Sequence, residues 1–289
     1  MTTSYAARPI KRVRATKQQM EDRQDRIEAL AREHGPCSVR HIFYRAVVDQ
    51  MPGITKNRSG YEKVQRELLR LRREGRVPYH LIVDNSRTVF EIDTFTGPAS
   101  FLEDVAGLYR RDLWARTPYR VEVWCESDSI ASTLLGVART WRVPVFPIRG
   151  QTSETFAYNA AQSWGRDRLP VVLYIGDHDP AGLEIELSLK SKLVGFAADA
   201  GIDWVSWRRV GVTWDQVAEM DLPGTKPKKD YGFPLSVEAE ALPPRLLVDL
   251  VDAAIAEHVD RHLLDQLQAV EDEEREGLYA LAESMGGAA

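Results

Sequence analysis

The chain has 289 residues, enough for two domains of ordinary size, and its composition of 44% hydrophobic and 28% charged residues excludes a disordered chain. Its net charge of −5 is unevenly distributed, because residues 1–90 contain 19 Lys and Arg against 10 Asp and Glu, whereas residues 91–289 contain 19 basic and 33 acidic residues. The apolar runs are far shorter than the roughly 20 residues that cross a bilayer, and the basic N-terminus lacks the apolar core of a secretion signal, so we expect a cytoplasmic protein with no membrane partner.

The charge asymmetry and the cysteines narrow the possible partners. A basic half suits a phosphate backbone, and an acidic half suits bound cations. Two solvated surfaces that differ in charge are the alternative. The two cysteines, Cys37 and Cys125, have no metal-ligand spacing, which argues against a disulfide framework and a zinc site.

Helical periodicity dominates the basic half. The predicted helices span residues 20–34, 39–47 and 58–75, and an apolar stretch over 79–84 predicts a strand. This order of elements is typical of a winged helix-turn-helix. We therefore predict a winged-helix (CAP-like) DNA-binding domain over residues 20–95, preceded by a flexible basic arm over residues 1–19.

The third predicted helix carries the arginines expected to contact DNA. They are Arg66, Arg70, Arg73 and Arg76. Arginines on a helix are equally typical of a solvated face, but the basic arm belongs to the same predicted domain. If these side chains neutralise phosphates, the affinity for DNA will fall steeply with salt.

The acidic half has a different pattern, in which short apolar strands alternate with helices beyond a linker over residues 96–118. The predicted strands cover 121–125, 143–148 and 169–175, the helices between them 128–140 and 153–164, and a later amphipathic helix for packing or dimer contact 246–255. Such alternation predicts a Rossmann-like parallel sheet, in a domain over residues 119–289. Chemistry collects at the carboxyl ends of parallel strands, and Arg149, after the second strand, is expected to contact DNA.

Three carboxylates after strand ends predict a metal site. Asp177 and Asp179 are two apart in extended chain, so both can lean to one side, and Glu126 follows the neighbouring strand. Carboxylates without nearby imidazole or thiolate suit Mg²⁺. A lone Asp-x-Asp is more often a turn or a helix cap, but three gathered negative charges need a cation or a basic partner. His258 and His262 lack a third ligand and suit an exposed helix face.

Three strings of residues carry a family resemblance. They are Val-Trp-Cys-Glu ending at Glu126, Arg149-Gly150, and Gly-Asp-His-Asp-Pro-Ala-Gly ending at Gly182. Together they resemble a Toprim domain, most closely that of the topoisomerase VI A subunit and its meiotic break-forming relatives. The resemblance implies that Glu126, Asp177 and Asp179 bind Mg²⁺ beside a scissile DNA phosphate.

The same family has its nucleophilic tyrosine on the winged-helix domain, and Arg40-His-Ile-Phe-Tyr44 resembles that motif. The resemblance implies that Tyr44 attacks a DNA phosphate and forms a 5′-phosphotyrosyl bond, while Arg40 helps to hold the phosphate. A phenol is a poor nucleophile at neutral pH unless a cation or a base lies near it. In the absence of the Toprim match, an aromatic pair on an amphipathic helix is more typical of a core.

The resemblance also implies partners. In the family the tyrosine of one subunit works with the metal site of the other, which implies a homodimer acting on double-stranded DNA in a nucleoid-associated setting. The chain is close in length to the compact Mini-A forms and has no ATPase module, so a separate B-type ATPase subunit is a possible partner. Lys228 and Lys229, in a basic loop over residues 222–230, are expected to touch DNA, although a plain surface loop fits them as well.

Three alternatives remain open. In a Toprim nuclease, metal-activated water would be the nucleophile and Tyr44 would be structural. A non-catalytic DNA-binding protein would retain the acidic residues without using them. A nucleotide-binding dehydrogenase fits less well, because no Gly-x-Gly-x-x-Gly follows the first strand and Glu126 would place negative charge where a pyrophosphate must bind.

Overall fold

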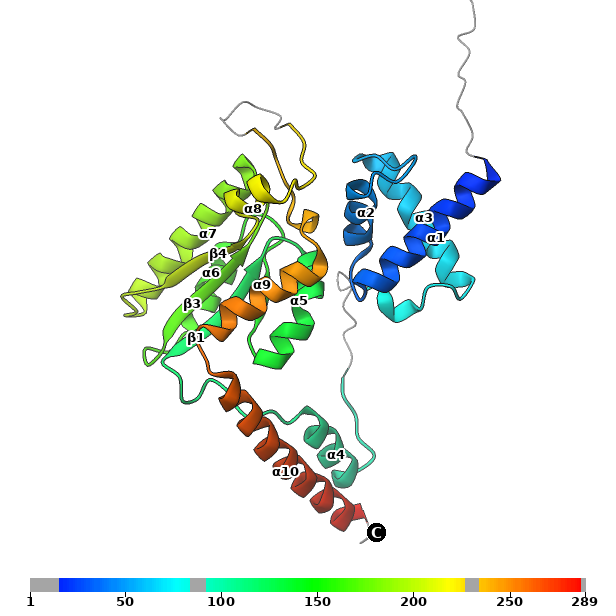
Figure 1. Cartoon of the computed structure of the whole chain (residues 1–289). Coiled ribbons are helices and arrows are strands. Elements are labelled where there is room, and N and C mark those ends of the chain that lie inside the picture. The colour runs from blue at the N-terminus through cyan, green and yellow to red at the C-terminus, as the bar shows by residue number, and fades with distance from the viewer. Residues whose placement is uncertain (1–15, 84–91, 227–233, 287–289) are drawn as a thin grey trace, which may run out of the picture.

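The computed structural model describes residues 16–83, 92–226 and 234–286, which form a mixed α/β structure around one four-stranded parallel sheet. Figure 1 shows three parts: a group of N-terminal helices, the sheet with helices on both faces, and a pair of helices that extends away from the sheet. In the described residues, no helix is long and apolar enough to cross a membrane.

The three helices predicted from apolar periodicity in the basic half are confirmed. They are α1 Lys17–His34, α2 Val39–Val48 and α3 Arg58–Arg73. Each begins at a residue whose side-chain oxygen accepts a hydrogen bond from a backbone N–H of the first turn: Thr16, Ser38 and Asn57. Their apolar faces meet in a common core that includes the fully buried Ile27 and Ile42. Because α1 begins at Lys17, the last residues of the predicted arm are helical, and residues 1–15 lie outside the described residues.

The prediction of a strand over residues 79–84 is wrong for residues 79–83, which are the ones that the structure describes. Tyr79–Leu81 forms a 3₁₀ helix, η1, in which Leu81 N donates to Pro78 O at 3.2 Å. Only Ile82 makes a β-bridge, with Cys37. A short apolar run is compatible with a strand or with any buried turn, so its apolarity alone did not decide between them.

The predicted parallel sheet is confirmed. Its strands are β1 Tyr119–Cys125, β2 Val145–Pro147, β3 Leu169–Ile175 and β4 Ser206–Gly211, in the order β2-β1-β3-β4. The helices packed on it are α5 Asp128–Trp141, α6 Glu154–Gln162, α7 Pro180–Asp199 and α9 Pro244–Ala256. Alternate strand residues face opposite layers: Leu173 belongs to the core with α5 and α9, and Tyr174 to the core with α6 and α7. The sheet is therefore buried on both faces (Figure 1).

The strand order positions the acidic residues. From β1 the chain crosses to β2 on one side, and β3 then pairs with β1 on the other, so the order reverses between β1 and β3. Ligands of open α/β sheets bind at the carboxyl ends of strands where the order reverses. Glu126 directly follows β1, and Asp177 follows β3 after Gly176. Two shorter elements, α8 Trp214–Glu219 and η2 Ala239–Ala241, complete this end of the sheet.

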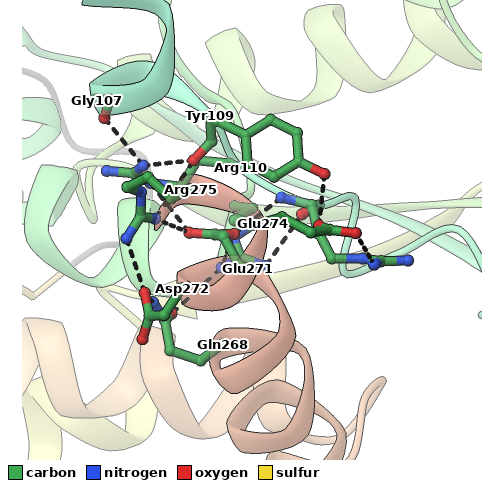
Figure 2. Close-up of polar contacts among 10 residues, drawn as sticks. Gly107, Tyr109, Arg110, Gln268, Glu271, Asp272, Glu274 and Arg275 are labelled. Carbon is green, nitrogen blue, oxygen red and sulfur yellow. Dashed lines mark hydrogen bonds and ion pairs between the residues drawn. The ribbon is translucent and has the colours of Figure 1, made fainter. Parts of the chain in front are cut away.

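The predicted linker over residues 96–118 contains a helix, α4 Pro98–Leu108. It packs along α10 Arg261–Gly286, and the two helices lie side by side away from the sheet (Figure 1). The fully buried Glu271 carboxylate fixes α10: it accepts from Arg111 N at 2.8 Å and lies 2.7 Å from the Arg142 guanidinium. Arg275, one turn further along α10, lies 2.5 Å from the same carboxylate (Figure 2).

Candidate active site

Two of the predicted metal-binding residues meet at the ends of β1 and β3. Glu126 Oε1 accepts hydrogen bonds from Asp177 N and from the Tyr174 hydroxyl, both at 3.0 Å. A side chain at Gly176 would collide with this arrangement, because its Cβ would lie 2.2 Å from Glu126 Oε1. The glycine therefore allows the carboxylate of one strand to approach the backbone of the other.

The third predicted ligand, Asp179, has a structural role in the same stretch. Its Oδ1 accepts from Gly182 N at 2.8 Å and caps α7, as an isolated Asp-x-Asp would. Within the described part of the chain, no three His, Cys, Asp or Glu residues form a ready-made metal-ligand group. The structure thus brings Glu126 and Asp177 together, and burial, with a smaller contribution from the charge of Asp179, raises the pKa of Glu126.

The free carboxylate oxygens fit a hard cation. Asp177 Oδ1 accepts from Ala239 N at 2.8 Å. The other oxygens, Oε2 of Glu126 and Oδ2 of Asp177 and Asp179, accept no hydrogen bond from the described residues. Burial and the charge of Glu126 raise the pKa of Asp177 to about 7, and burial raises the pKa of Glu126. Mutually repelling carboxylates with unengaged oxygens are a donor set that Mg²⁺ could bind while it keeps several waters.

The pKa of Asp177, raised by burial and by the charge of Glu126, predicts how stability depends on pH in EDTA. The pKa of Asp177 rises from 3.8 to about 7 on folding, so between these values the folded state holds a proton that the unfolded state has lost. The free energy of unfolding therefore falls as pH rises through this window, and the cost is complete above pH 7. We expect Asp177→Asn in EDTA at pH 8 to be more stable than wild type by on the order of 3 kcal/mol, and the difference to vanish near pH 4.

Urea denaturation of both proteins across this pH range measures the effect. Mg²⁺ provides the control: it should stabilise the wild type at pH 8 and leave the Asn variant unchanged. Parallel pH profiles for the two proteins would show that the Asp177 carboxylate is not destabilised.

The tyrosine motif faces these strand ends from α2. The Tyr44 hydroxyl donates to Glu238 Oε2, and Arg40 lies 3.3 Å from the same carboxylate and 3.7 Å from that of Glu240. The Lys56 ammonium lies over the Tyr44 ring, 5.1 Å from its centroid. Burial and the adjacent Glu238 raise the pKa of Tyr44, so the phenol keeps its proton at neutral pH.

Glu238 and Glu240 belong to a segment that crosses the carboxyl end of β3. Val237 pairs with His178 through two backbone hydrogen bonds, of 2.7 and 3.1 Å, and Glu240 accepts from the Ser127 hydroxyl at 3.0 Å. Neither glutamate nor Lys56 was predicted from the sequence as part of the site. The alternation Val-Glu-Ala-Glu repeats the i, i+2 spacing of the aspartates and was an available signal, although it does not indicate which strand end the segment reaches.

A cavity of about 490 Å³ opens beside the tyrosine. Its walls include Arg40, Tyr44, Lys56, Asn57, Arg58 and Glu238. Tyr44 itself is only 3% exposed, and part of its remaining surface faces this space. Basic and hydrogen-bonding side chains on several walls suit an anionic group of the size of a phosphate.

Polar contacts hold α2 against the sheet region of the same chain. The buried His41 ring lies 3.4 Å from the Ser129 hydroxyl of α5, and Arg45 donates to Ala241 O. Burial lowers the pKa of His41 to about 3, so the ring is neutral and suits a hydroxyl partner. The resemblance implied that the tyrosine of one subunit meets the metal site of another, whereas here Tyr44 faces the strand ends of its own chain.

Some of the arginines predicted to bind DNA form ion pairs with carboxylates, and others do not. Arg70 lies 2.7 Å from Glu74, Arg76 lies 2.7 Å from both Asp25 and Glu28, and Arg149 lies 2.9 Å from Asp128. Arg66 and Arg73, both exposed on α3, have no carboxylate partner among the described residues. Lys228 and Lys229 lie outside the described residues.

Comparison with models of protein families, with curated proteins and with solved structures finds no match for this chain.

Proposed function

We propose that the protein is a Mg²⁺-dependent DNA-cleaving transesterase of the topoisomerase VI A class, with a winged-helix-like DNA-binding region and a Toprim-like sheet. The observation that supports this most directly is the placement of Tyr44 and Arg40 opposite the carboxylates at the β1 and β3 ends. Two motifs more than 80 residues apart in sequence, Arg40 to Tyr44 and Glu126, thus converge on one place. Double-stranded DNA would be the substrate, and a homodimer and a separate ATPase subunit are proposed partners.

The chemistry divides among the residues of the site. Tyr44 would attack the phosphorus of a backbone phosphate, and Arg40 and Lys56 would bind the phosphate oxygens beside the phenol. Glu126, Asp177 and Asp179 would hold Mg²⁺, which when bound neutralises negative charge on the reacting phosphate. The product would be a 5′-phosphotyrosyl bond and a free 3′-hydroxyl.

Purified protein incubated with supercoiled plasmid and Mg²⁺, then denatured with and without protease, tests the proposal. We expect broken DNA whose 5′ ends carry protein until protease removes it, and no breakage in EDTA. Cut ends free of protein, or no cutting of any DNA tried, would count against a transesterase.

The affinity for DNA should depend on Arg66 and Arg73, two arginines of α3 without a carboxylate partner among the described residues. Replacing Arg66 and Arg73 by alanine is expected to weaken binding and to reduce the slope of log affinity against log salt by about 2, since each lost phosphate contact removes nearly one released counterion. Fluorescence anisotropy of a labelled duplex at several salt concentrations measures the slope. Arg139→Ala, at the exposed end of α5, is the matched control and should leave the slope unchanged.

The burial of Tyr44 favours a second candidate, a nuclease that uses water as its nucleophile. A phenol that is 3% exposed and bonded to a carboxylate is also what a structural tyrosine would show. In that case Tyr44→Phe would still cut DNA, whereas Asp177→Ala would not. The plasmid experiment with these two variants separates the candidates.

A further inference from the structure

The hydrogen bond from the Tyr44 hydroxyl to Glu238 indicates a role for Glu238 in proton transfer. Of the side chains in described residues, only the Glu238 carboxylate is hydrogen-bonded to the Tyr44 hydroxyl, and the phenol is the donor. We propose that Glu238 is the general base of the cleavage step and takes the phenolic proton as Tyr44 attacks DNA. This inference rests on the proposed transesterase function.

The other polar groups near Tyr44 are not placed to accept the phenolic proton. Glu240 Oε1 accepts from the Ser127 hydroxyl and faces Arg40. Lys56 lies over the face of the Tyr44 ring and donates to Pro223 O at 3.2 Å. His41 is buried, and its Nδ1 faces the hydroxyls of Ser38 and Ser129. Each of these groups is directed elsewhere, so Glu238 is the group in position to receive the proton.

The setting also suits a base that must release its proton again. Glu238 is about one-third exposed at its side chain, and Arg40 lies 3.3 Å from its Oε2. The exposed part of its side chain gives the proton a path to water after the transfer. The phenol keeps its proton because burial and Glu238 raise its pKa, so attack at neutral pH requires an acceptor within hydrogen-bond reach.

The step balances with water as the only other reactant, which gives one proton and becomes hydroxide. A bond forms between Tyr44 Oη and phosphorus, and the bond between phosphorus and the 3′ oxygen breaks. The phenolic proton passes to Glu238 Oε2, and the departing 3′ oxygen takes a proton from water. In the reverse direction, protonated Glu238 returns its proton to Tyr44 as the strand is resealed.

Single-turnover formation of the protein–DNA adduct tests the role, with wild type, Glu238→Gln and Glu240→Gln compared in Mg²⁺. Glutamine keeps the size of the side chain and its amide oxygen still accepts from the phenol, but it takes up no proton. We expect Glu238→Gln to form the adduct at least about 100-fold more slowly. Glu240→Gln removes the same charge without contacting the phenol and should lose far less. Melting temperature and DNA affinity show whether each variant is folded.

Fluorinated tyrosine at position 44 separates a base from a residue that merely positions the phenol. A fluorinated phenol is more acidic and needs less help from a base. We expect it to restore adduct formation in Glu238→Gln and to change the wild type little. Failure to restore the rate in Glu238→Gln would assign Glu238 to positioning alone and overturn the proposal.

Mixing two inactive variants tests whether base and nucleophile come from one chain. Tyr44→Phe mixed with Glu238→Gln should give no more adduct than the two proteins alone, because each chain lacks one of the pair. Restoration by mixing would place the working base on a second chain and overturn the assignment to the same chain.

The outcomes separate this inference from the proposed function. A wild-type adduct together with a fully active Glu238→Gln overturns the base and leaves the transesterase standing. Absence of any adduct in the wild type overturns the transesterase, and the base with it.

Discussion

Replacement of Tyr44 by phenylalanine is expected to remove the protein-linked DNA ends completely, while binding of DNA stays nearly unchanged. The ring would stay in place, since it packs edge-on against Phe43 at 5.3 Å between ring centroids and lies under Lys56. Only the hydroxyl is lost, and no other hydroxyl in described residues shares its contact with Glu238. Because the covalent intermediate needs that oxygen, the loss should be total rather than partial.

The cost of Tyr44→Phe to stability should be small. The hydroxyl donates to a carboxylate that is partly exposed and keeps Arg40 as a partner, so a loss of about 1 kcal/mol is expected. Tyr79→Phe is the matched control, because Tyr79 lies on η1 and its ring is largely exposed. Protein-linked ends are counted after denaturation and digestion of the plasmid. Linked ends that persist in Tyr44→Phe would exclude Tyr44 as the nucleophile.

Replacement of Glu271 by alanine is expected to have the largest effect on stability. Its carboxylate is 0% exposed and lies 2.7 Å from the Arg142 guanidinium. Arg275 lies 2.5 Å and Arg110 3.7 Å from the same carboxylate (Figure 2). Removal of this carboxylate leaves the Arg142 guanidinium, whose side chain is 11% exposed, without a carboxylate partner among the described residues. Breaking one side of a buried ion pair costs about 3–5 kcal/mol.

Thermal unfolding followed by circular dichroism measures this loss, which should correspond to a fall of roughly 10 °C in the melting temperature. Asp272→Ala is the control: its carboxylate also lies 2.7 Å from Arg275 but is half exposed, so a change of less than about 1 kcal/mol is expected. Hydrogen exchange should show faster opening of α10 in Glu271→Ala. A melting temperature equal to that of wild type would mean that water replaces the carboxylate at no cost.

Much of the sheet was predictable because periodicity and register are local properties. The apolar run of β3 and the glycine and aspartates after it indicated a strand end, and parallel pairing then requires the residue after β1 to lie beside it. The contact between Glu126 and Asp177 was therefore predictable from the sequence. The N-terminal helices were predictable for the same reason, since caps and apolar faces are set within each segment.

The remaining features depend on contacts between distant residues. Glu238 reaches Tyr44 only because Val237 pairs with His178, and no local pattern specifies that bridge. The strand β4 was missed because Ser206–Gly211 carries two arginines in a short stretch and shows little apolar alternation. In the sequence, nothing distinguishes Glu271 of α10 from a surface glutamate. Its burial follows from contacts with arginines that are distant in the chain, such as Arg142.

The pairing of α4 with α10 has a consequence for how the protein is made. Tyr109, just after α4, bonds to Glu274 of α10, 165 residues further along the chain. A ribosome that adds about 5–20 residues per second needs about 10–30 s to cover that distance. During this interval the inner face of α4 has no partner, while the N-terminal helices have already emerged. Nascent chains stalled before residue 261 should therefore expose α4 to proteases and chaperones, and chains released after α10 should not.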